Sequence, residues 1–137
     1  MLRGLARARA ASDYQICMWL ECGFGLEVHR RYAYASFREY SERVFQLSGR
    51  QTEDRLRVAR ALPSLPVLAR AFREGRVGYA TVRELTRVVT GETEVEWLER
   101  AQGRTTREVE RMVSGRKPGD RPDDPPRPTS IRCAGRS

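Results

Sequence analysis

The chain has 137 residues, of which 39% are hydrophobic and 32% charged, and its formal net charge at pH 7 is +8. This length suffices for one domain with a modest core. No apolar run approaches the roughly 20 residues of a membrane span, and no hydrophobic segment follows the N-terminal arginines as a secretory signal requires. The three cysteines are an odd number, which argues against a disulfide framework. We therefore predict a cytoplasmic protein without membrane contact.

Residues 1–12 are rich in arginine and alanine, and we predict a flexible N-terminus there. From residue 13 onward, helical periodicity, caps and short connections predict an all-α domain that continues to residue 115. Asp13 can cap a first helix. Gly23 and Gly25 are expected to interrupt that helix, because a glycine in a helix interior costs about 1 kcal/mol.

The segment 36–62 predicts two short helices that meet at a tight turn. Ser36 with Glu39, and Ser48 with Gln51, have the spacing of capping boxes. The connection between the two helices is too short for anything except a corner. Two capped helices around such a corner are the outline of a helix-turn-helix.

Further helices are predicted downstream. Pro66 stands where a helix can begin, Thr93 can cap another, and Thr105 with Glu108 has the spacing of a third capping box. We find no convincing alternation typical of strands. Residues 116–137 are rich in proline, glycine and aspartate at their start and predict a linker and disordered tail.

Five segments occur in a recognisable order: 56–63 (LRVARALP), 75–76 (GR), 82–88 (VRELTRV), 92–98 (ETEVEWL) and 116–122 (RKPGDRP). In this order they resemble the N-terminal helical region of bacterial HNH-endonuclease-type proteins. A looser similarity links the chain to plasmid-partition-type helix-turn-helix domains. Two positions depart from the pattern. Gly49 stands where the relatives usually have proline, and Thr52 stands where a helix-turn-helix buries an apolar residue.

In the HNH family a C-terminal nuclease module with a metal site follows the linker. Hydrolysis by a metal-activated water needs a metal cage and a base, and this chain has a single histidine, His29. The resemblance therefore implies a helical domain that is not an enzyme on its own and carries no cofactor. A truncated or frameshifted nuclease gene and a stand-alone relative are both compatible with it.

Twenty-six residues are basic, and all of them except Lys117 are arginine. Arginine suits phosphate and guanine edges, although a GC-rich genome produces the same bias. If the helix after Ser48 is a recognition helix, its first residues face bases and its later arginines lie near phosphate. A second basic cluster could follow the DNA backbone. The candidate nucleic-acid-binding residues are Arg50, Gln51, Asp54, Arg55, Arg57, Arg76 and Arg83.

The same charges have a plainer interpretation as a solvated helix face, with Glu53 and Arg57 as an ordinary i,i+4 pair. Other candidate sites are weaker. Cys17, Cys22 and His29 lack a nearby fourth zinc ligand, so we predict no metal site and expect the two cysteines to be buried as small hydrophobes. Trp19 and Trp97 are predicted core anchors. Glu94, Glu96 and Glu99 are predicted on a helix surface.

The sequence therefore favours a non-catalytic, all-α domain that binds or positions double-stranded DNA. The alternative is a helical domain that docks a partner protein or forms a homodimer, with its charge serving only solubility. The aromatic residues predicted to form that surface are Phe24, Phe37, Phe45 and Trp97.

Overall fold

The computed structural model describes residues 2–123, apart from the side chains of residues 2, 3 and 6. Every regular element in this part of the chain is helical, which confirms the predicted all-α fold. None of these helices is long and apolar enough to cross a membrane. The elements are α1 (Leu2–Gly25), α2 (Val28–Arg31), α3 (Phe37–Phe45), α4 (Gly49–Ala61), the short 3-10 helix η1 (Leu62–Ser64), α5 (Pro66–Arg73), α6 (Tyr79–Leu85), α7 (Glu94–Ala101) and α8 (Thr106–Val113).

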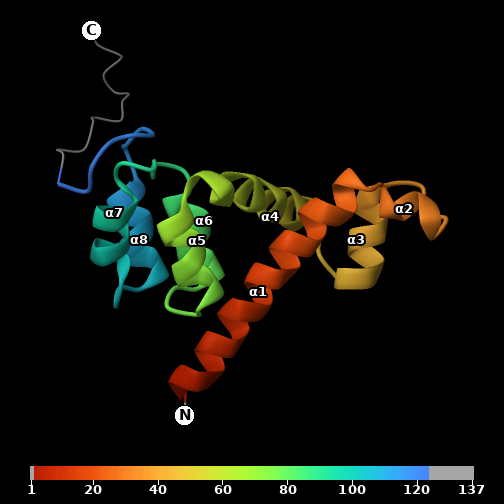
Figure 1. Cartoon of the computed structure of the whole chain (residues 1–137), viewed down its shortest axis with the longest axis horizontal. Helices are drawn as coiled ribbons and strands as arrows, with labels where there is room; N and C mark the ends of the chain where they lie inside the picture. The colour runs from red at the N-terminus through yellow and green to blue at the C-terminus, as the bar shows by residue number, and fades with distance from the viewer. Residues whose placement is uncertain (1, 124–137) are drawn as a thin grey trace, which may run out of the picture.

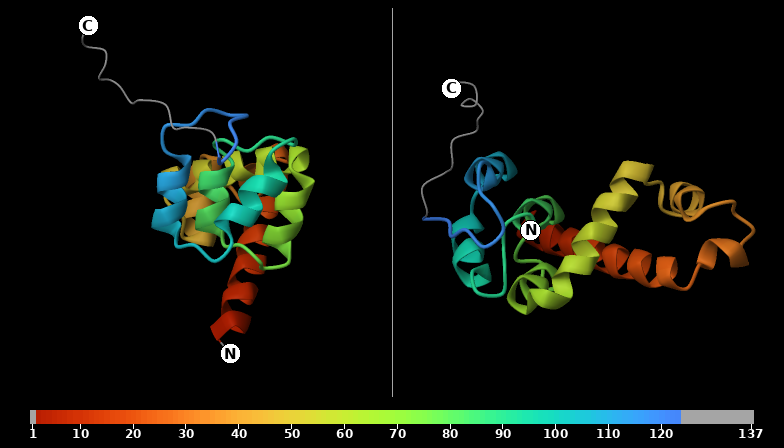
Figure 2. Two further views of the ribbon diagram at one scale, coloured as in Figure 1. Left: turned by 90° about the vertical axis from the view of Figure 1, so that its left-hand side faces the viewer. Right: turned by 90° about the horizontal axis from the view of Figure 1, so that it is seen from above.

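Helices α1 and α4 join two groups of helices. Helices α5 to α8 gather at one end of the molecule, and α2 and α3 lie at the other (Figure 1). Seen from above, α1 and α4 cross between these two ends (Figure 2, right). Each end has its own core, and both cores draw on the crossing helices.

The large core is formed around Phe72 and Trp97, which are both fully buried. Cys17 of α1 and Val58 of α4 belong to it. The small core contains Leu20 of α1, Leu56 of α4, and Val28, Phe37 and Tyr40. Burial of one such large side chain contributes about 1.5–3 kcal/mol. Both cores therefore stabilise the same pair of crossing helices.

The N-terminus differs from the prediction, because the residues predicted to be flexible form the first half of α1. Ala10 is buried in the large core. Gly75, which has a φ of +80°, lies so close to α1 that a Cβ there would be 2.7 Å from the Arg7 Cα and carbonyl oxygen. A glycine in the turn after α5 thus allows the backbone of α1 to pack against it, a contact that the arginine- and alanine-rich composition does not reveal.

The predicted interruption of α1 is correct at Gly25, where the helix ends, but wrong at Gly23, which lies inside the helix. Gly23 is buried, and a Cβ added to it would be 3.2 Å from Val28 Cγ2 and 3.7 Å from the Phe37 ring. The close approach of α2 and α3 offsets the helix-propensity cost of this glycine.

Two of the three predicted capping boxes are confirmed in full, and the third is partial. Ser36 Oγ accepts from the Glu39 N–H, but the Glu39 carboxylate accepts from the N–H of Ala35 rather than of Ser36. Thr93 does not cap α7; its Oγ accepts from the Thr90 N–H at 3.0 Å instead. The complete boxes are Ser48 with Gln51 and Thr105 with Glu108.

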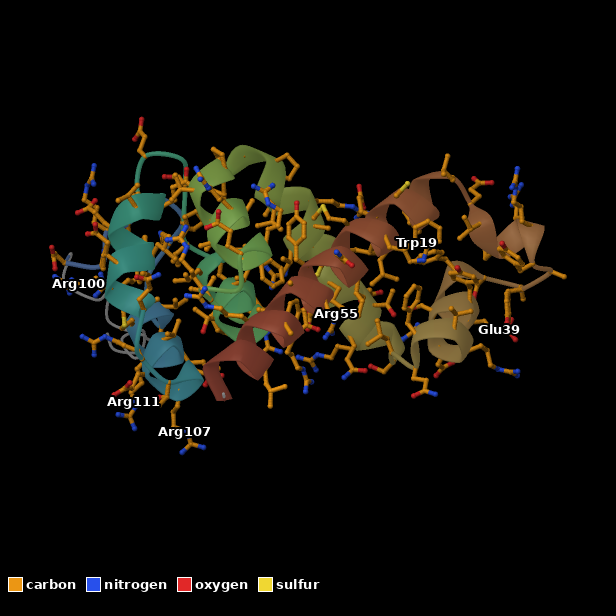
Figure 3. All side chains as sticks on the ribbon, turned by 60° about the horizontal axis from the view of Figure 1, so that its bottom comes forward. Trp19, Glu39, Arg55, Arg100, Arg107 and Arg111 are labelled. Atoms are coloured by element: carbon orange, nitrogen blue, oxygen red, sulfur yellow. The ribbon has the colours of Figure 1, made fainter. Side chains whose placement is uncertain are left out.

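The two tryptophans differ in burial. Trp97 is fully buried, as predicted, whereas Trp19 is 41% exposed on α1 (Figure 3), so its assignment to the core is wrong. The buried face of α1 carries Ala10, Cys17 and Leu20, which pack against the helices beneath it. Apolar spacing alone did not distinguish this face from the exposed one.

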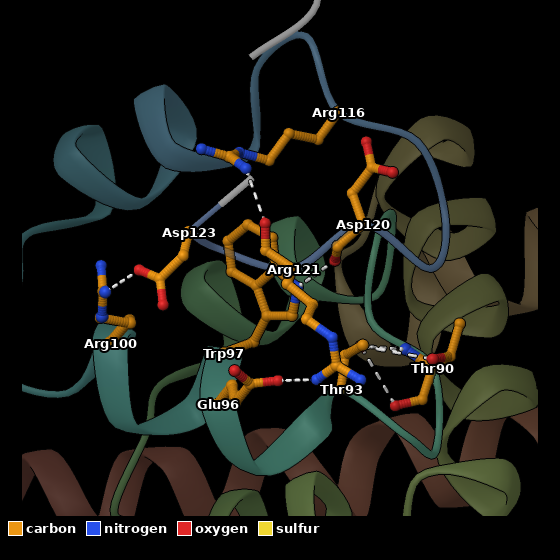
Figure 4. Close-up of polar contacts among 9 residues, drawn as sticks. All are labelled: Thr90, Thr93, Glu96, Trp97, Arg100, Arg116, Asp120, Arg121 and Asp123. Carbon is orange, nitrogen blue, oxygen red and sulfur yellow. Dashed lines mark hydrogen bonds and ion pairs between the residues drawn. The ribbon is translucent and has the colours of Figure 1, made fainter. Parts of the chain in front are cut away.

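Residues 116–123, predicted to begin a disordered linker, fold back over α7. Trp97 Nε1 donates to the Asp120 carbonyl at 2.8 Å, and the Gly119 N–H donates to the Val88 carbonyl at 2.9 Å. Ion pairs join Arg100 to Asp123 and Arg121 to Glu96 (Figure 4). This segment therefore belongs to the folded domain, contrary to the boundary predicted at residue 115. Residues 124–137 of the predicted tail lie outside the described residues.

A carboxylate from α7 caps α5 from across the large core. Glu94, predicted to lie on a helix surface, is only 5% exposed. Its Oε1 accepts from the N–H groups of Val67 and Leu68, each at 3.0 Å. These donors belong to the first turn of α5, whose N-cap residue Leu65 provides no side-chain acceptor. Glu94 thus satisfies orphan donors and complements the helix dipole.

We expect Glu94→Ala to lower the free energy of unfolding by about 2–3 kcal/mol, because it leaves two largely buried N–H groups without an acceptor. Urea denaturation followed by circular dichroism measures this change. The matched control is Glu99→Ala on the exposed side of α7, where we expect a change within about 0.5 kcal/mol. Equal effects of the two substitutions would contradict the capping role.

Candidate nucleic-acid interface

The corner between α3 and α4 is fixed by a buried polar pair. Ser41 Oγ and Thr52 Oγ1 are 2.8 Å apart, and both residues are buried. The Thr52 hydroxyl donates to the Ser48 carbonyl at 2.9 Å, so the Ser41 hydroxyl donates to Thr52. The threonine that departs from the expected apolar pattern is therefore satisfied, and its hydrogen bonds hold α4 in register against α3.

Two arginines lie at the first turn of α4. The guanidinium of Arg38 from α3 occupies the space that a side chain at Gly49 would need. Arg50 follows directly in the sequence, and both arginines are exposed. Neither forms an ion pair with a described carboxylate. The first turn of α4 contains no acidic residue, so cations gather at the positive end of a helix dipole.

The residues that follow Arg50 on α4 do not present further free cations at this corner. Gln51 Oε1 accepts from the Ser48 N–H at 2.9 Å, so its amide takes part in the capping box. Glu53 is exposed and Asp54 is half-buried, and both place negative charge beside the arginines. The predicted pair between Glu53 and Arg57 is not formed.

Arg57 instead connects α4 to α6. Its Nη1 donates to Thr86 Oγ1 at 3.0 Å, and its Nη2 donates to the Arg83 carbonyl at 3.2 Å. The residue is half-buried. Two N–H groups of this guanidinium therefore have acceptors inside the protein and link α4 to the end of α6.

Arg55 is held between three helices. Its side chain is 15% exposed and lies 3.9 Å from the Asp13 carboxylate of α1. Its guanidinium carbon stacks 4.2 Å from the centroid of the Tyr79 ring of α6, a cation–π contact. Figure 3 shows Arg55 beside α1 in the middle of the molecule, whereas Arg107 and Arg111 project outward from α8.

Burial also alters the titration of groups near Arg55. It raises the pKa of the Cys17 thiol to about 12, although the charge of Arg55 acts in the opposite direction. It raises the pKa of Tyr79 to about 12 for the same reason. At neutral pH the phenol therefore keeps its proton, and Cys17 is not a thiolate nucleophile.

The two remaining predicted contacts have acidic partners. Arg76 Nε lies 3.2 Å from Glu74 Oε1, and Arg83 Nε lies 3.5 Å from Glu84 Oε2. A hydrogen bond from Arg70, the largest of several contributions, lowers the pKa of Glu74. Among the predicted site residues, only Arg50 presents an exposed cation without an ionic partner in residues 2–123.

Several exposed arginines that have no ion-pair partner among the described residues were not among the predicted site residues. They come from several helices and from the connection before α8. No local signal marks them, because partners such as Glu21, which pairs with Arg60 at 2.9 Å, come from distant helices. These arginines are Arg7 and Arg9 on α1, Arg31 on α2, Arg38 and Arg43 on α3, Arg73 on α5, Arg104 before α8, and Arg107 and Arg111 on α8.

No group of three or more His, Cys, Asp or Glu side chains within the described residues could hold a metal ion. Cys17 is buried but Cys22 is exposed, so the prediction that both are buried is wrong for Cys22. Cys133 lies outside the described residues.

No protein-family model, curated protein or solved structure matches this chain. The likeness to HNH-endonuclease-type proteins therefore rests on the ordered sequence segments alone. A function has to be inferred from the surface that the described residues build.

We expect Arg57→Ala to lower the free energy of unfolding by about 1.5–3 kcal/mol, because two acceptors on α6 lose a charged donor. Thermal denaturation measures the change, and Arg57→Lys should recover only part of it because an ammonium cannot fork to both oxygens. Arg50→Ala is the control, since this exposed arginine has no ionic partner in the part of the chain that the structure describes. An Arg57→Ala variant as stable as Arg50→Ala would show that the link to α6 contributes nothing.

Proposed function

We propose that this chain is a non-catalytic domain that binds or positions double-stranded DNA through the corner between α3 and α4. The observation that carries the proposal is the pair of exposed arginines, Arg38 and Arg50, at the first turn of α4, neither of which has an ionic partner among the described residues. A helix N-terminus attracts phosphate through its N–H groups and its dipole. Two guanidinium groups beside it add the charge that releases counterions from DNA.

The contact that this surface favours is with the DNA backbone rather than with base edges. Glu53 and Asp54 follow the arginines along α4 and repel phosphate beyond the first turn. The Gln51 amide, which would otherwise suit adenine, is held in the capping box. Backbone contacts position a protein on DNA but carry no sequence information. The proposed role is therefore positioning, with little sequence preference.

The resemblance to HNH-endonuclease-type proteins supports the same role. In proteins of that kind the nuclease module supplies the chemistry, and a helical domain that grips the backbone would present DNA to it. We accordingly propose a cytoplasmic location, where bacterial DNA is found, and no catalysis by this domain alone.

We expect anisotropy titrations with a fluorescent duplex to show log affinity falling linearly with log salt. Arg38→Gln and Arg50→Gln should each weaken binding and reduce the salt slope by about 1, since each removes one phosphate contact. Arg30→Gln is the matched control, because Arg30 on α2 is exposed and pairs with Glu27 at 3.3 Å. The proposal fails if the duplex does not bind at the lowest salt, or if Arg30→Gln weakens binding as much.

A second candidate function, docking to a protein or to another copy of this chain, is favoured by exposed apolar side chains near the small core. The surface differs from the predicted one, since Phe37 and Trp97 are buried and Phe45 is half-buried. Contiguous exposed apolar surface is typical of interaction sites. The large exposed apolar residues at this end are Trp19, Phe24, Leu26, Tyr32 and Val44.

If the chain uses this surface to self-associate, light scattering will give the mass of a dimer. The Leu26→Ser variant should then have the mass of a monomer, because Leu26 is 69% exposed and its apolar surface would be buried in the dimer. Val95→Ser removes an exposed apolar side chain from α7 at the opposite end and should leave the dimer intact. A monomeric wild-type protein at all concentrations would exclude self-association.

A further inference from the structure

A cavity of about 530 Å³ opens between α1, α4 and the start of α6. It contains neither of the arginines at the corner of α3 and α4. Its lining combines apolar residues with charged and hydroxyl groups, as in sites that take a small molecule with a polar head. The lining residues are Leu5, Arg9, Ala10, Asp13, Arg55, Gly78, Tyr79 and Ala80.

The charges that line this cavity sum to a positive value. Arg9 is exposed and has no ionic partner among the described residues. Arg55 faces the single carboxylate of the lining, that of Asp13, across 3.9 Å. This separation exceeds the roughly 2.7–2.9 Å typical of a charge-assisted hydrogen bond. One loosely held carboxylate therefore opposes two guanidinium groups.

Two hydrogen-bond donors of lining residues have no acceptor. Arg55 Nε and the Tyr79 hydroxyl are both buried, and neither has a hydrogen-bond partner in the described part of the chain. Buried polar atoms without partners are rare and costly, so each one needs an explanation. The Tyr79 phenol is protonated at neutral pH, so its hydroxyl can donate a hydrogen bond.

We propose that this cavity binds a phosphate group, with Arg9, Arg55 and Tyr79 as its donors. A phosphate offers several acceptor oxygens in a tetrahedral arrangement, which suits donors that come from three different helices. Arginine is the side chain best matched to that anion. The apolar lining residues suit the remainder of a phosphate ester.

The stacking of Arg55 on Tyr79 supports a preorganised site. The guanidinium lies 4.2 Å from the ring centroid, so the Arg55 and Tyr79 side chains are held against each other. Arg9 lies on the exposed side of α1 and can close over the anion from solvent. The site does not depend on the proposed DNA-binding corner, because the two share no residue.

The test is thermal denaturation of the full chain in inorganic phosphate and in chloride at matched ionic strength. We expect a saturable rise of the midpoint in phosphate. Arg9→Gln and Tyr79→Phe should weaken the apparent phosphate affinity at least fivefold.

The matched control is Arg7→Gln. Arg7 is an exposed arginine of the same helix, two positions before Arg9, and it is not among the residues that line the cavity. Glutamine keeps the Cβ that packs near Gly75 and removes only the charge, so the phosphate affinity should stay unchanged. No saturable rise in the wild type, or an equal loss of affinity in Arg7→Gln, would overturn the proposal.

Tyr79→Phe separates a ligand-binding hydroxyl from a structural one. Because this hydroxyl has no hydrogen-bond partner in the described part of the chain, we expect the variant to be at least as stable as wild type in chloride. It should lose only the additional stability that phosphate provides. A variant that is destabilised in chloride and keeps its full response to phosphate would overturn the assignment.

Duplex titrations identify the source of the phosphate. If Arg9→Gln and Tyr79→Phe weaken duplex binding as well as inorganic phosphate binding, the group is a DNA phosphodiester. If they weaken only inorganic phosphate binding, the ligand is a small phosphate ester. Both outcomes support the pocket. The Arg38→Gln and Arg50→Gln variants report separately on the DNA-binding corner, so failure of one proposal is distinguishable from failure of the other.

Discussion

The crossing of α1 over α4 is the constraint on which the rest of the structure depends. Leu20 and Leu56 place these helices in the small core, and Cys17 and Val58 place them in the large core. A polar contact reinforces the crossing, because Arg60 of α4 forms an ion pair with Glu21 of α1 at 2.9 Å. The N-terminal half of α4 carries the candidate DNA-binding corner, and its middle lines the cavity. Both sites are therefore held by one packed helix rather than by loops.

Signals within one turn of helix were readable from the sequence, whereas contacts between distant helices were not. The capping box of Ser48 with Gln51 depends only on residues three apart, and it formed as predicted. Glu94 has the sequence context of a surface residue, yet its partners are N–H groups of α5. Gly75 gives no hint in the sequence that it accommodates the backbone of Arg7. Such contacts depend on tertiary packing, which periodicity does not encode.

The same limit explains why most of the predicted DNA-contact residues have partners inside the protein. Residues 50, 55 and 57 of α4 are all arginines. If α4 buried only one stripe of its surface, all three would be exposed. Helix α4 is covered on several sides, by α1, α3 and α6. Of these three arginines only Arg50 is exposed, whereas Arg55 contacts α1 and Tyr79, and Arg57 donates to Thr86 and to the Arg83 carbonyl. The packing of the neighbouring helices decides which arginines of α4 remain exposed. The sequence of α4 alone does not show that packing.

Helix geometry also keeps the two candidate anion sites apart. Arg50 and Arg55 are separated by five positions on α4, which corresponds to roughly 7.5 Å along the axis and roughly 140° around it. One side chain points to solvent near the corner, and the other lies against α1 and Tyr79. A DNA backbone lying straight along the corner would therefore meet Arg50 without reaching Arg55. Ligands at the two sites need not compete, and any coupling between them would pass through α4 itself.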